Sequence, residues 1–141
     1  MKIEKIMKKP VFVSPDATKE ELFKIAKKHP SVDLFIVVDK NRKFLGDLNE
    51  DDLFLMILPN EQYEDIGVEL AFDLQKKFFA TTAKELMRKH DISCYENEDI
   101  MDVALRLAGE EVNEIPVLNK KDQVVGFVDE GLLLRHIKYK K

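Results

Sequence analysis

Few side chains in this sequence combine the types and spacing that catalysis or metal binding requires. The histidines, His29, His90 and His136, lie far apart and follow no spacing typical of metal ligands. Cys94, the single cysteine, falls on a predicted inward-facing strand, which indicates a small buried thiol rather than a nucleophile. A single cysteine also excludes an internal disulfide, which fits a reducing cytosol.

The densest group of potential ligands is the acidic run Glu50-Asp51-Asp52. Neighbouring residues on a helix point about 100° apart, so these carboxylates do not form one metal cage. Capping and solvation account for Glu50 and Asp51, whereas Asp52 stays open to two interpretations, a capping residue or a binding residue. No Ser/His/Asp, Cys/His or paired-carboxylate constellation is present, so we predict no enzyme activity, no metal site and no cofactor.

Composition limits the partners of the chain. Its 141 residues carry a formal net charge of -4 with mixed signs, which offers no broad basic face for nucleic acid. No apolar run approaches the roughly 20 residues needed to span a membrane, and the segment Met1–Lys5 does not read as a signal peptide. We therefore expect a cytoplasmic protein made of one compact domain or of two half-domains that share an interface.

The elements that must position any site occur twice along the chain. Corresponding residues are offset by 80 or 81 positions: Met7 and Met87, Gly46 and Gly126, Val13 and Cys94. A unit this small cannot bury a core alone, so the two copies are expected to pack on each other. The cleft between paired copies is then the expected place for a ligand.

Each copy is predicted to be a β-α-β-β-α unit that follows a short lead-in segment. The expected strands cover residues 11–13, 34–38 and 43–48 in the first copy, and 92–94, 114–118 and 123–128 in the second. The first helix is capped by Asp16 or Thr18 and stops at His29-Pro30; the other helices are expected over 51–58, 99–108 and 130–139. Residues 1–58 then form the first motif, 59–81 a linker with a helix over 64–79, and 82–141 the second motif.

This repeated pattern resembles the cystathionine-β-synthase (CBS) domain, and the tandem pair resembles a Bateman module. The residues that carry the likeness are Met7, Met87, Val11–Thr18, Ile115–Val117, Gly46, Gly126 and Asp52. The resemblance implies an α/β (α+β) fold of two β-α-β-β-α units related by a pseudo-two-fold. Their sheets would pack together with the helices outside.

By resemblance, clefts between the two motifs bind adenosine-containing ligands such as AMP, ADP, ATP or S-adenosylmethionine. In the family, the third residue after the glycine is usually Ser or Thr, and the sixth is usually an Asp that accepts ribose hydroxyls. Here Gly46 is followed by Asn49 and Asp52, so the ribose acceptor is intact. The adenine would lie near three residues of the second motif, namely Asp91, Ile92 and Ser93.

The second cleft is predicted to bind more weakly. Gly126 is followed by Asp129 and Leu132, which removes the ribose acceptor and places an anion where a phosphate would approach. Asp33 and Asn113 stand where family members often carry a basic residue, so phosphate binding looks poor in both copies. The residues expected around this cleft are Val11, Phe12, Pro116, Val117 and Asp129.

A homodimer is also expected, since many such modules dimerise. The last helix of each copy carries more apolar residues than one small core needs: Phe54, Leu55, Ile57, Leu133, Leu134 and Ile137. The leading interpretation is a regulatory module that binds an adenosyl ligand and signals to a partner protein. The alternative is a degenerate, ligand-free pair that acts as a scaffold for dimerisation or docking.

Overall fold

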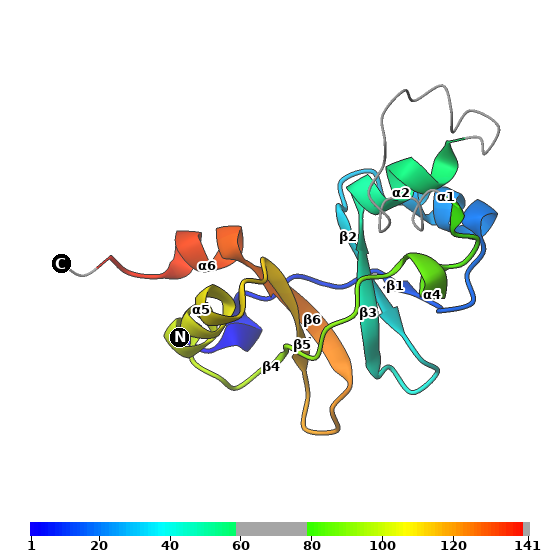
Figure 1. Ribbon diagram of the computed structural model, residues 1–141. Helices are drawn as coiled ribbons and strands as arrows, with labels where there is room; N and C mark the ends of the chain where they lie inside the picture. The colour runs from blue at the N-terminus through cyan, green and yellow to red at the C-terminus, as the bar shows by residue number, and fades with distance from the viewer. Residues whose placement is uncertain (59–78, 140–141) are drawn as a thin grey trace. The chain divides into compact units, whose positions relative to one another are not determined.

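The structure, a computed structural model, describes residues 1–58 and 79–139 (Figure 1). The elements are η1 (Ile3–Lys5), β1 (Phe12–Val13), α1 (Lys19–Lys28), β2 (Leu34–Val38), β3 (Phe44–Asn49), α2 (Glu50–Ile57), α4 (Ala83–Leu86), β4 (Cys94–Tyr95), α5 (Ile100–Glu110), β5 (Glu114–Leu118), β6 (Val124–Asp129) and α6 (Glu130–His136). The predicted linker helix over 64–79 falls almost entirely outside the described residues. The order of the elements confirms two β-α-β-β-α repeats.

The strands form two three-stranded sheets with the same order, β1-β2-β3 and β4-β5-β6. In each sheet the first strand runs parallel to the second, with Val13 opposite Val37 and Cys94 opposite Val117. Val37 and Val117 are 80 residues apart, whereas Val13 and Cys94 are 81 apart. This register confirms the one-residue slip between the copies at the first strand.

The chain divides into two compact units. The N-unit comprises Val11–Lys40 and Leu45–Lys89, and the C-unit comprises Met1–Pro10, Asn41–Phe44 and His90–Lys141. In the N-unit the sheet and its helices share one apolar core, formed by Val13, Leu22, Phe35, Val37, Leu48, Leu53, Met56, Ala83 and Leu86. The core of the C-unit is formed by Ile3, Ile6, Cys94, Ile100, Val103, Leu107, Ile115, Val117, Val128 and Leu133.

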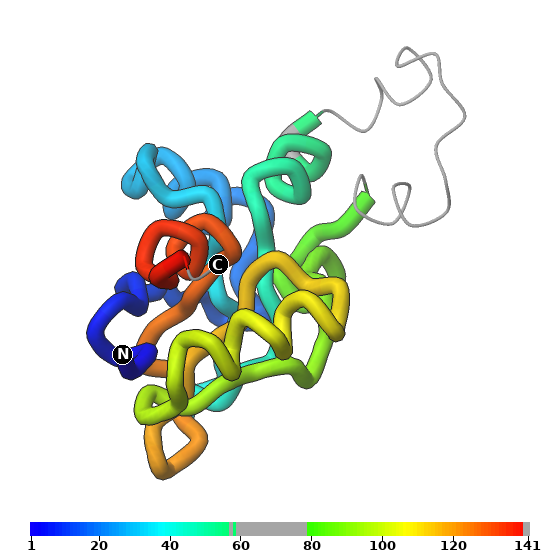
Figure 2. The backbone as a smooth tube through the Cα atoms, turned by 90° about the vertical axis from the view of Figure 1, so that its left-hand side faces the viewer, coloured from blue at the N-terminus to red at the C-terminus, as the bar shows by residue number. Residues whose placement is uncertain are grey.

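The lead-in of each sequence repeat packs with the sheet of the other repeat. Lys8 N donates to Phe127 O (2.9 Å) and Phe127 N donates to Lys8 O (3.1 Å), so the first lead-in pairs with β6. Arg88 and Asp47 form the same two bonds at 2.9 and 3.0 Å, so the second lead-in pairs with β3. Figure 2 shows the blue N-terminal segment beside the orange strand of the second repeat. The units of packing therefore cross the boundaries of the sequence repeats.

The repeated methionines and glycines are explained by this exchange. A Cβ atom on Gly46 would lie 2.6 Å from Arg88 O and 2.9 Å from Met87 Sδ. A Cβ atom on Gly126 would lie 2.6 Å from Met7 Sδ. Each methionine therefore occupies the space above the glycine of the other repeat. Only a residue without a side chain allows so close an approach.

The first strand of the second copy begins later than the predicted 92–94. Ile92 and Ser93 precede β4, which starts at Cys94. Ile92 N donates to His90 Nδ1 (3.2 Å), and Ser93 O accepts from Arg106 Nη1 (2.9 Å). Side chains satisfy these backbone groups in place of ladder bonds, which accounts for the shift. Likewise α6 ends at His136 instead of residue 139, because Ile137 is extended with ψ of 130°.

Candidate functional site

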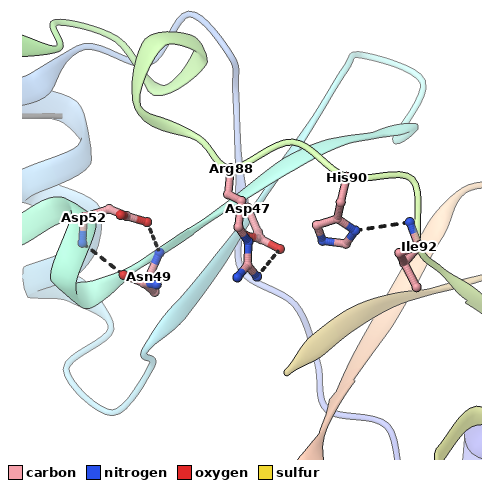
Figure 3. Close-up of polar contacts among 6 residues, drawn as sticks. All are labelled: Asp47, Asn49, Asp52, Arg88, His90 and Ile92. Atoms are coloured by element: carbon pink, nitrogen blue, oxygen red, sulfur yellow. Dashed lines mark hydrogen bonds and ion pairs between the residues drawn. The ribbon is translucent and has the colours of Figure 1, made fainter. Parts of the chain in front are cut away.

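The junction of β3 and α2 holds the best candidate side chains of the N-unit (Figure 3). Asn49 is the N-cap of α2, and its Oδ1 accepts from Asp52 N at 3.0 Å. Asp52 Oδ2 accepts in return from Asn49 N at 3.1 Å. This reciprocal capping box explains why the sequence starts a helix here after an apolar strand. It holds the Asp52 carboxylate, which is only 3% exposed, at the positive end of α2.

Asp52 is therefore a capping residue, and the arrangement also suits an acceptor. A carboxylate has about four lone-pair sites, and its charge strengthens each hydrogen bond that it accepts. Gly46 lies on β3 under Met87 and Arg88, where it permits the close approach of the second lead-in. The structure thus brings Gly46, Asn49 and Asp52 together in one strand–helix turn.

An ion pair links Asp47 on the same strand to Arg88 of the second lead-in, and it was missed by sequence reasoning. Arg88 Nε and Nη2 donate to Asp47 Oδ1 and Oδ2 at 3.2 and 3.3 Å (Figure 3). Asp47 is only 4% exposed, so the two bonds from Arg88 offset part of the cost of burying its carboxylate. Asp47 follows Gly46 and Arg88 follows Met87, but this spacing indicates the pair only once the contact of Met87 with Gly46 is known.

The corresponding turn of the C-unit lacks half of this arrangement. Asp129 caps α6 through a bond from Leu132 N to Oδ1 (2.8 Å), but Leu132 offers no carboxylate in return. Asp129 Oδ2 also lies 3.6 Å from Lys8 Nζ, and this ammonium stands 5.9 Å from the centroid of the Phe127 ring. The anion predicted at Asp129 is thus accompanied by a cation that the sequence did not reveal.

The predicted adenine-contacting residues are consecutive in the C-unit. Asp91 is exposed, while Ile92 and Ser93 are half-buried. The ring of His90 accepts from Ile92 N and stands 5.1 Å, centroid to centroid, from the ring of Phe44. These residues therefore belong to a different unit from Asn49 and Asp52.

The residues predicted around the second cleft are likewise divided between the units. Val11 and Phe12 lie in the N-unit, where Phe12 is opposite Ile36 on the neighbouring strand. Pro116 and Val117 are buried in β5 of the C-unit. Phe12, Pro116 and Val117 are strand residues, and Val11 directly precedes β1.

Burial determines the role of Cys94, the single cysteine. Cys94 is 1% exposed, and burial raises the pKa of its thiol to about 12, so it is the small buried thiol that was predicted. Within residues 1–58 and 79–139, no group of three His, Cys, Asp or Glu side chains could hold a metal ion. In the same ranges, every helix is too short or too polar to cross a lipid bilayer.

The comparison with protein families decides the identity of the repeats. The model of the CBS domain matches residues 3–58 and 83–139. This chain belongs to the CBS domain family. The two matched segments are the sequence repeats with their lead-ins, so the protein is a tandem CBS pair. A search of curated proteins found no match.

Solved CBS pairs share the fold at low sequence identity. The pair from MJ0100, in complex with 5′-methylthioadenosine and S-adenosyl-L-methionine, is 21% identical with a TM-score of 0.70, covering 96% of this chain and 94% of that chain. CBSX2 of Arabidopsis thaliana in complex with AMP is 16% identical with a TM-score of 0.68, covering 95% and 93%. The CBS domain of a CBS domain containing membrane protein from Sphaerobacter thermophilus is 22% identical with a TM-score of 0.73, covering 99% and 90%.

Proposed function

We propose that this CBS pair is a regulatory module that binds an adenosyl ligand through Asp52 and signals to a partner protein. The observation that carries the proposal is the capping box at the β3–α2 junction. It holds a carboxylate at the sixth residue after Gly46, where the family places its ribose acceptor. Two CBS pairs with the same fold were solved with adenosyl compounds, which supports this choice of ligand class.

The charges near Asp52 favour a ligand without a phosphate chain. Glu50 and Asp51 stand beside it, and the nearby cation Arg88 is held by the buried Asp47. A phosphate that drew Arg88 away would cost the buried Asp47 the two bonds that it accepts from the guanidinium, which is unfavourable. Adenosine, 5′-methylthioadenosine or S-adenosylmethionine should therefore bind at least as well as ATP.

A second candidate function, a ligand-free scaffold, is favoured by two observations. Asp52 is almost fully buried and already serves as a cap, so its presence is explained without a ligand. The N-unit also has an apolar cavity of about 270 Å³ between α1 and α2, with the exposed rings of Phe23 and Phe54 at its edge. Such a surface suits protein contacts.

A ligand screen separates the two functions. Thermal unfolding would be followed with adenosine, 5′-methylthioadenosine, S-adenosylmethionine, AMP, ADP and ATP, each at several concentrations. A ligand that binds only the folded state raises the unfolding temperature as its concentration rises. We expect such a rise with at least one adenosyl compound, and a larger rise with S-adenosylmethionine than with ATP. No rise with any of the six compounds would favour the scaffold.

A further inference from the structure

Two turns at matching positions of the repeats lie side by side in the C-unit. One follows β2 and the other follows β5, and corresponding residues of the two turns are 80 positions apart. Arg42 O accepts from Val124 N at 2.9 Å, and Lys43 Nζ donates to Lys121 O. The structure therefore places both turns on one surface of this unit.

The surface formed by the two turns is basic. Its cations, which we call the basic patch, all belong to exposed residues, namely Arg42, Lys43, Lys120 and Lys121. Asp122 is the one carboxylate within residues 41–44 and 119–124, and it accepts from Tyr95 OH at 2.6 Å. The preceding residues Asp39 and Lys40 add one charge of each sign. A chain with a net charge of -4 thus carries a local excess of positive charge.

The backbone that carries the basic patch is held in place by hydrogen bonds. Asn119 Oδ1 accepts from Lys121 N at 2.9 Å and from Gln123 N at 3.0 Å. Gln123 Nε2 in turn donates to Asn41 O at 3.3 Å, which ties the second turn to the first. A partner does not need to order these turns on binding, so less of its interaction free energy is lost.

Arg42 has an unfavourable backbone conformation. Its φ is 62°, in the left-handed region, where Gly, Asn and Asp are the favoured residues. The corresponding residue of the second repeat, Asp122, has nearly the same φ of 60° and is of a favoured type. An arginine at this position costs stability that an asparagine or aspartate would not. This cost points to a role for its guanidinium.

A partner with carboxylate groups suits the basic patch. The clustered cations repel one another, and carboxylates placed over them relieve that repulsion. The rest of the chain carries a net negative charge, so it repels an acidic partner and favours docking at the patch. A nucleic acid is less suited, because three of the four cations are lysines, whereas planar phosphate recognition favours arginine.

Resting on the proposed function for the existence of a partner protein, we propose that the basic patch is the docking surface for an acidic segment of that partner. The patch supplies the orientation of the complex, because only there does the chain attract negative charge. The surface is complete in the C-unit, so docking does not depend on the adenosyl site.

The test uses the full-length protein and a fluorescent oligoglutamate peptide, followed by fluorescence anisotropy. Wild type should bind the peptide, and more weakly as salt rises, because exposed charges are screened. The double variant Lys120→Gln/Lys121→Gln keeps the backbone bonds of the turn and should weaken binding about tenfold, since each exposed ion pair is worth up to about fivefold. The matched control, Lys27→Gln/Lys28→Gln, removes the same charge from exposed residues at the end of α1 and should leave the affinity nearly unchanged.

The variant Arg42→Asn separates docking from folding. Asparagine suits the left-handed conformation, so the unfolding temperature should stay the same or rise, while the affinity for the peptide falls. If Arg42→Asn and the double variant Lys120→Gln/Lys121→Gln both bind like wild type, the inference is overturned.

Three other outcomes would also overturn the inference. They are no binding of the peptide by wild type, equal losses in the two double variants, and tighter binding of an oligonucleotide that carries the same charge as the peptide. Equal losses would mean that only net charge matters, and a preference for the oligonucleotide would indicate a nucleic acid. The assay contains no adenosyl compound, so a failure of peptide binding is distinct from a failure of adenosyl binding in the ligand screen.

Discussion

Asp52 is the single residue on which the proposed function depends. Its carboxylate accepts from Asn49 N and lies 3% exposed at the start of α2. Asp52→Ala should weaken an adenosyl ligand by roughly 10- to 150-fold, because a charged acceptor is lost. It should also cost about 1 kcal/mol of stability, because half of the capping box is lost. Calorimetric titration and urea unfolding measure the two effects.

Two further variants separate capping from binding. Asp52→Asn keeps an oxygen that can accept from Asn49 N but removes the charge, so affinity should fall more than stability. Asp51→Ala removes an exposed carboxylate one residue away and should change neither by much. Affinity that is unchanged in Asp52→Ala would remove Asp52 from the site.

The two repeat glycines should differ in their tolerance of a methyl group. An added Cβ on Gly46 meets backbone, the Arg88 carbonyl, at 2.6 Å, whereas on Gly126 its nearest contact is the flexible Met7 side chain at 2.6 Å. We expect Gly46→Ala to cost about 1–3 kcal/mol in urea unfolding, and Gly126→Ala to cost less. Gly109→Ala is the control, because nothing lies within 4 Å of its Cβ position on α5. Equal costs at Gly46 and Gly109 would contradict the close approach.

At the scale of elements, the two repeats could be predicted from the sequence. The exchange of lead-in segments between the repeats could not. Apolar periodicity and turn residues are local, so they located the strands and most of the helices of both copies. The sheet on which a lead-in packs depends on contacts distant in sequence, which periodicity does not report. The equal spacing of Met7 and Gly46 with Met87 and Gly126 carried this information, but it becomes readable only once the contacts are known.

The candidate site could also be predicted only in part from the sequence. Asn49 and Asp52 could be found because a capping box has a fixed local spacing. Arg88 and Arg106 were missed, since each pairs with a carboxylate that no local pattern links to it. Asp47 is 41 residues from Arg88, and Glu98 reaches Arg106 only because the turn before α5 folds back.

The bond between the second lead-in and β3 should depend on the Asp47–Arg88 pair. The side chain of Asp47 is 5% exposed and that of Arg88 is 42% exposed. If Arg88 is removed, water therefore replaces only part of the hydrogen bonding that the guanidinium gives to Asp47. Arg88→Ala should cost about 1–3 kcal/mol in urea unfolding. Adding Asp47→Val, which removes the buried carboxylate, should recover part of this loss. A double variant less stable than Arg88→Ala would contradict the explanation.

The ion pair of Glu98 with Arg106 should make the stability of the fold depend on pH in the acidic range. The hydrogen bonds that Glu98 accepts from Arg106 lower the pKa of Glu98, so the unfolded state binds a proton more readily than the folded state. The resulting stability is present above the ordinary pKa of a glutamate and is lost as pH falls through the lowered folded value. Urea unfolding of wild type and Glu98→Gln should therefore differ at neutral pH and converge in strong acid. A difference independent of pH would contradict this account.

For the whole molecule, the unequal repeats predict one strong ligand site per chain. Leu132 stands where Asp52 stands in the first repeat, and Asp129 is occupied as the cap of α6 and as the partner of Lys8. Calorimetry with S-adenosylmethionine should therefore give one strong site per chain. Asp129→Ala should not weaken that site, although loss of the cap should cost about 1 kcal/mol of stability. Two equal ATP sites would refute the asymmetry.

The last prediction concerns association of the protein with itself. Of the six apolar residues first assigned to a dimer surface, Phe54 is 61% exposed and Leu134 is 78% exposed, so both can serve. Leu133 is 3% exposed and belongs to the C-unit core, which removes it from that surface; the side chain of Ile57 lies outside the described residues. Burying two such helix faces could supply on the order of 1,500 Å² of interface, the size of a stable dimer.

We therefore expect light scattering at micromolar concentration to give twice the chain mass of 16.4 kDa. Phe54→Glu and Leu134→Glu should each shift the protein towards the monomer, because a buried unpaired carboxylate opposes association. Tyr139→Glu is the matched control, since Tyr139 is 89% exposed but lies beyond the end of α6. A particle of single-chain mass would contradict the predicted dimer. If only Tyr139→Glu abolished the dimer, the interface would lie at the C-terminal segment and not on α2 and α6.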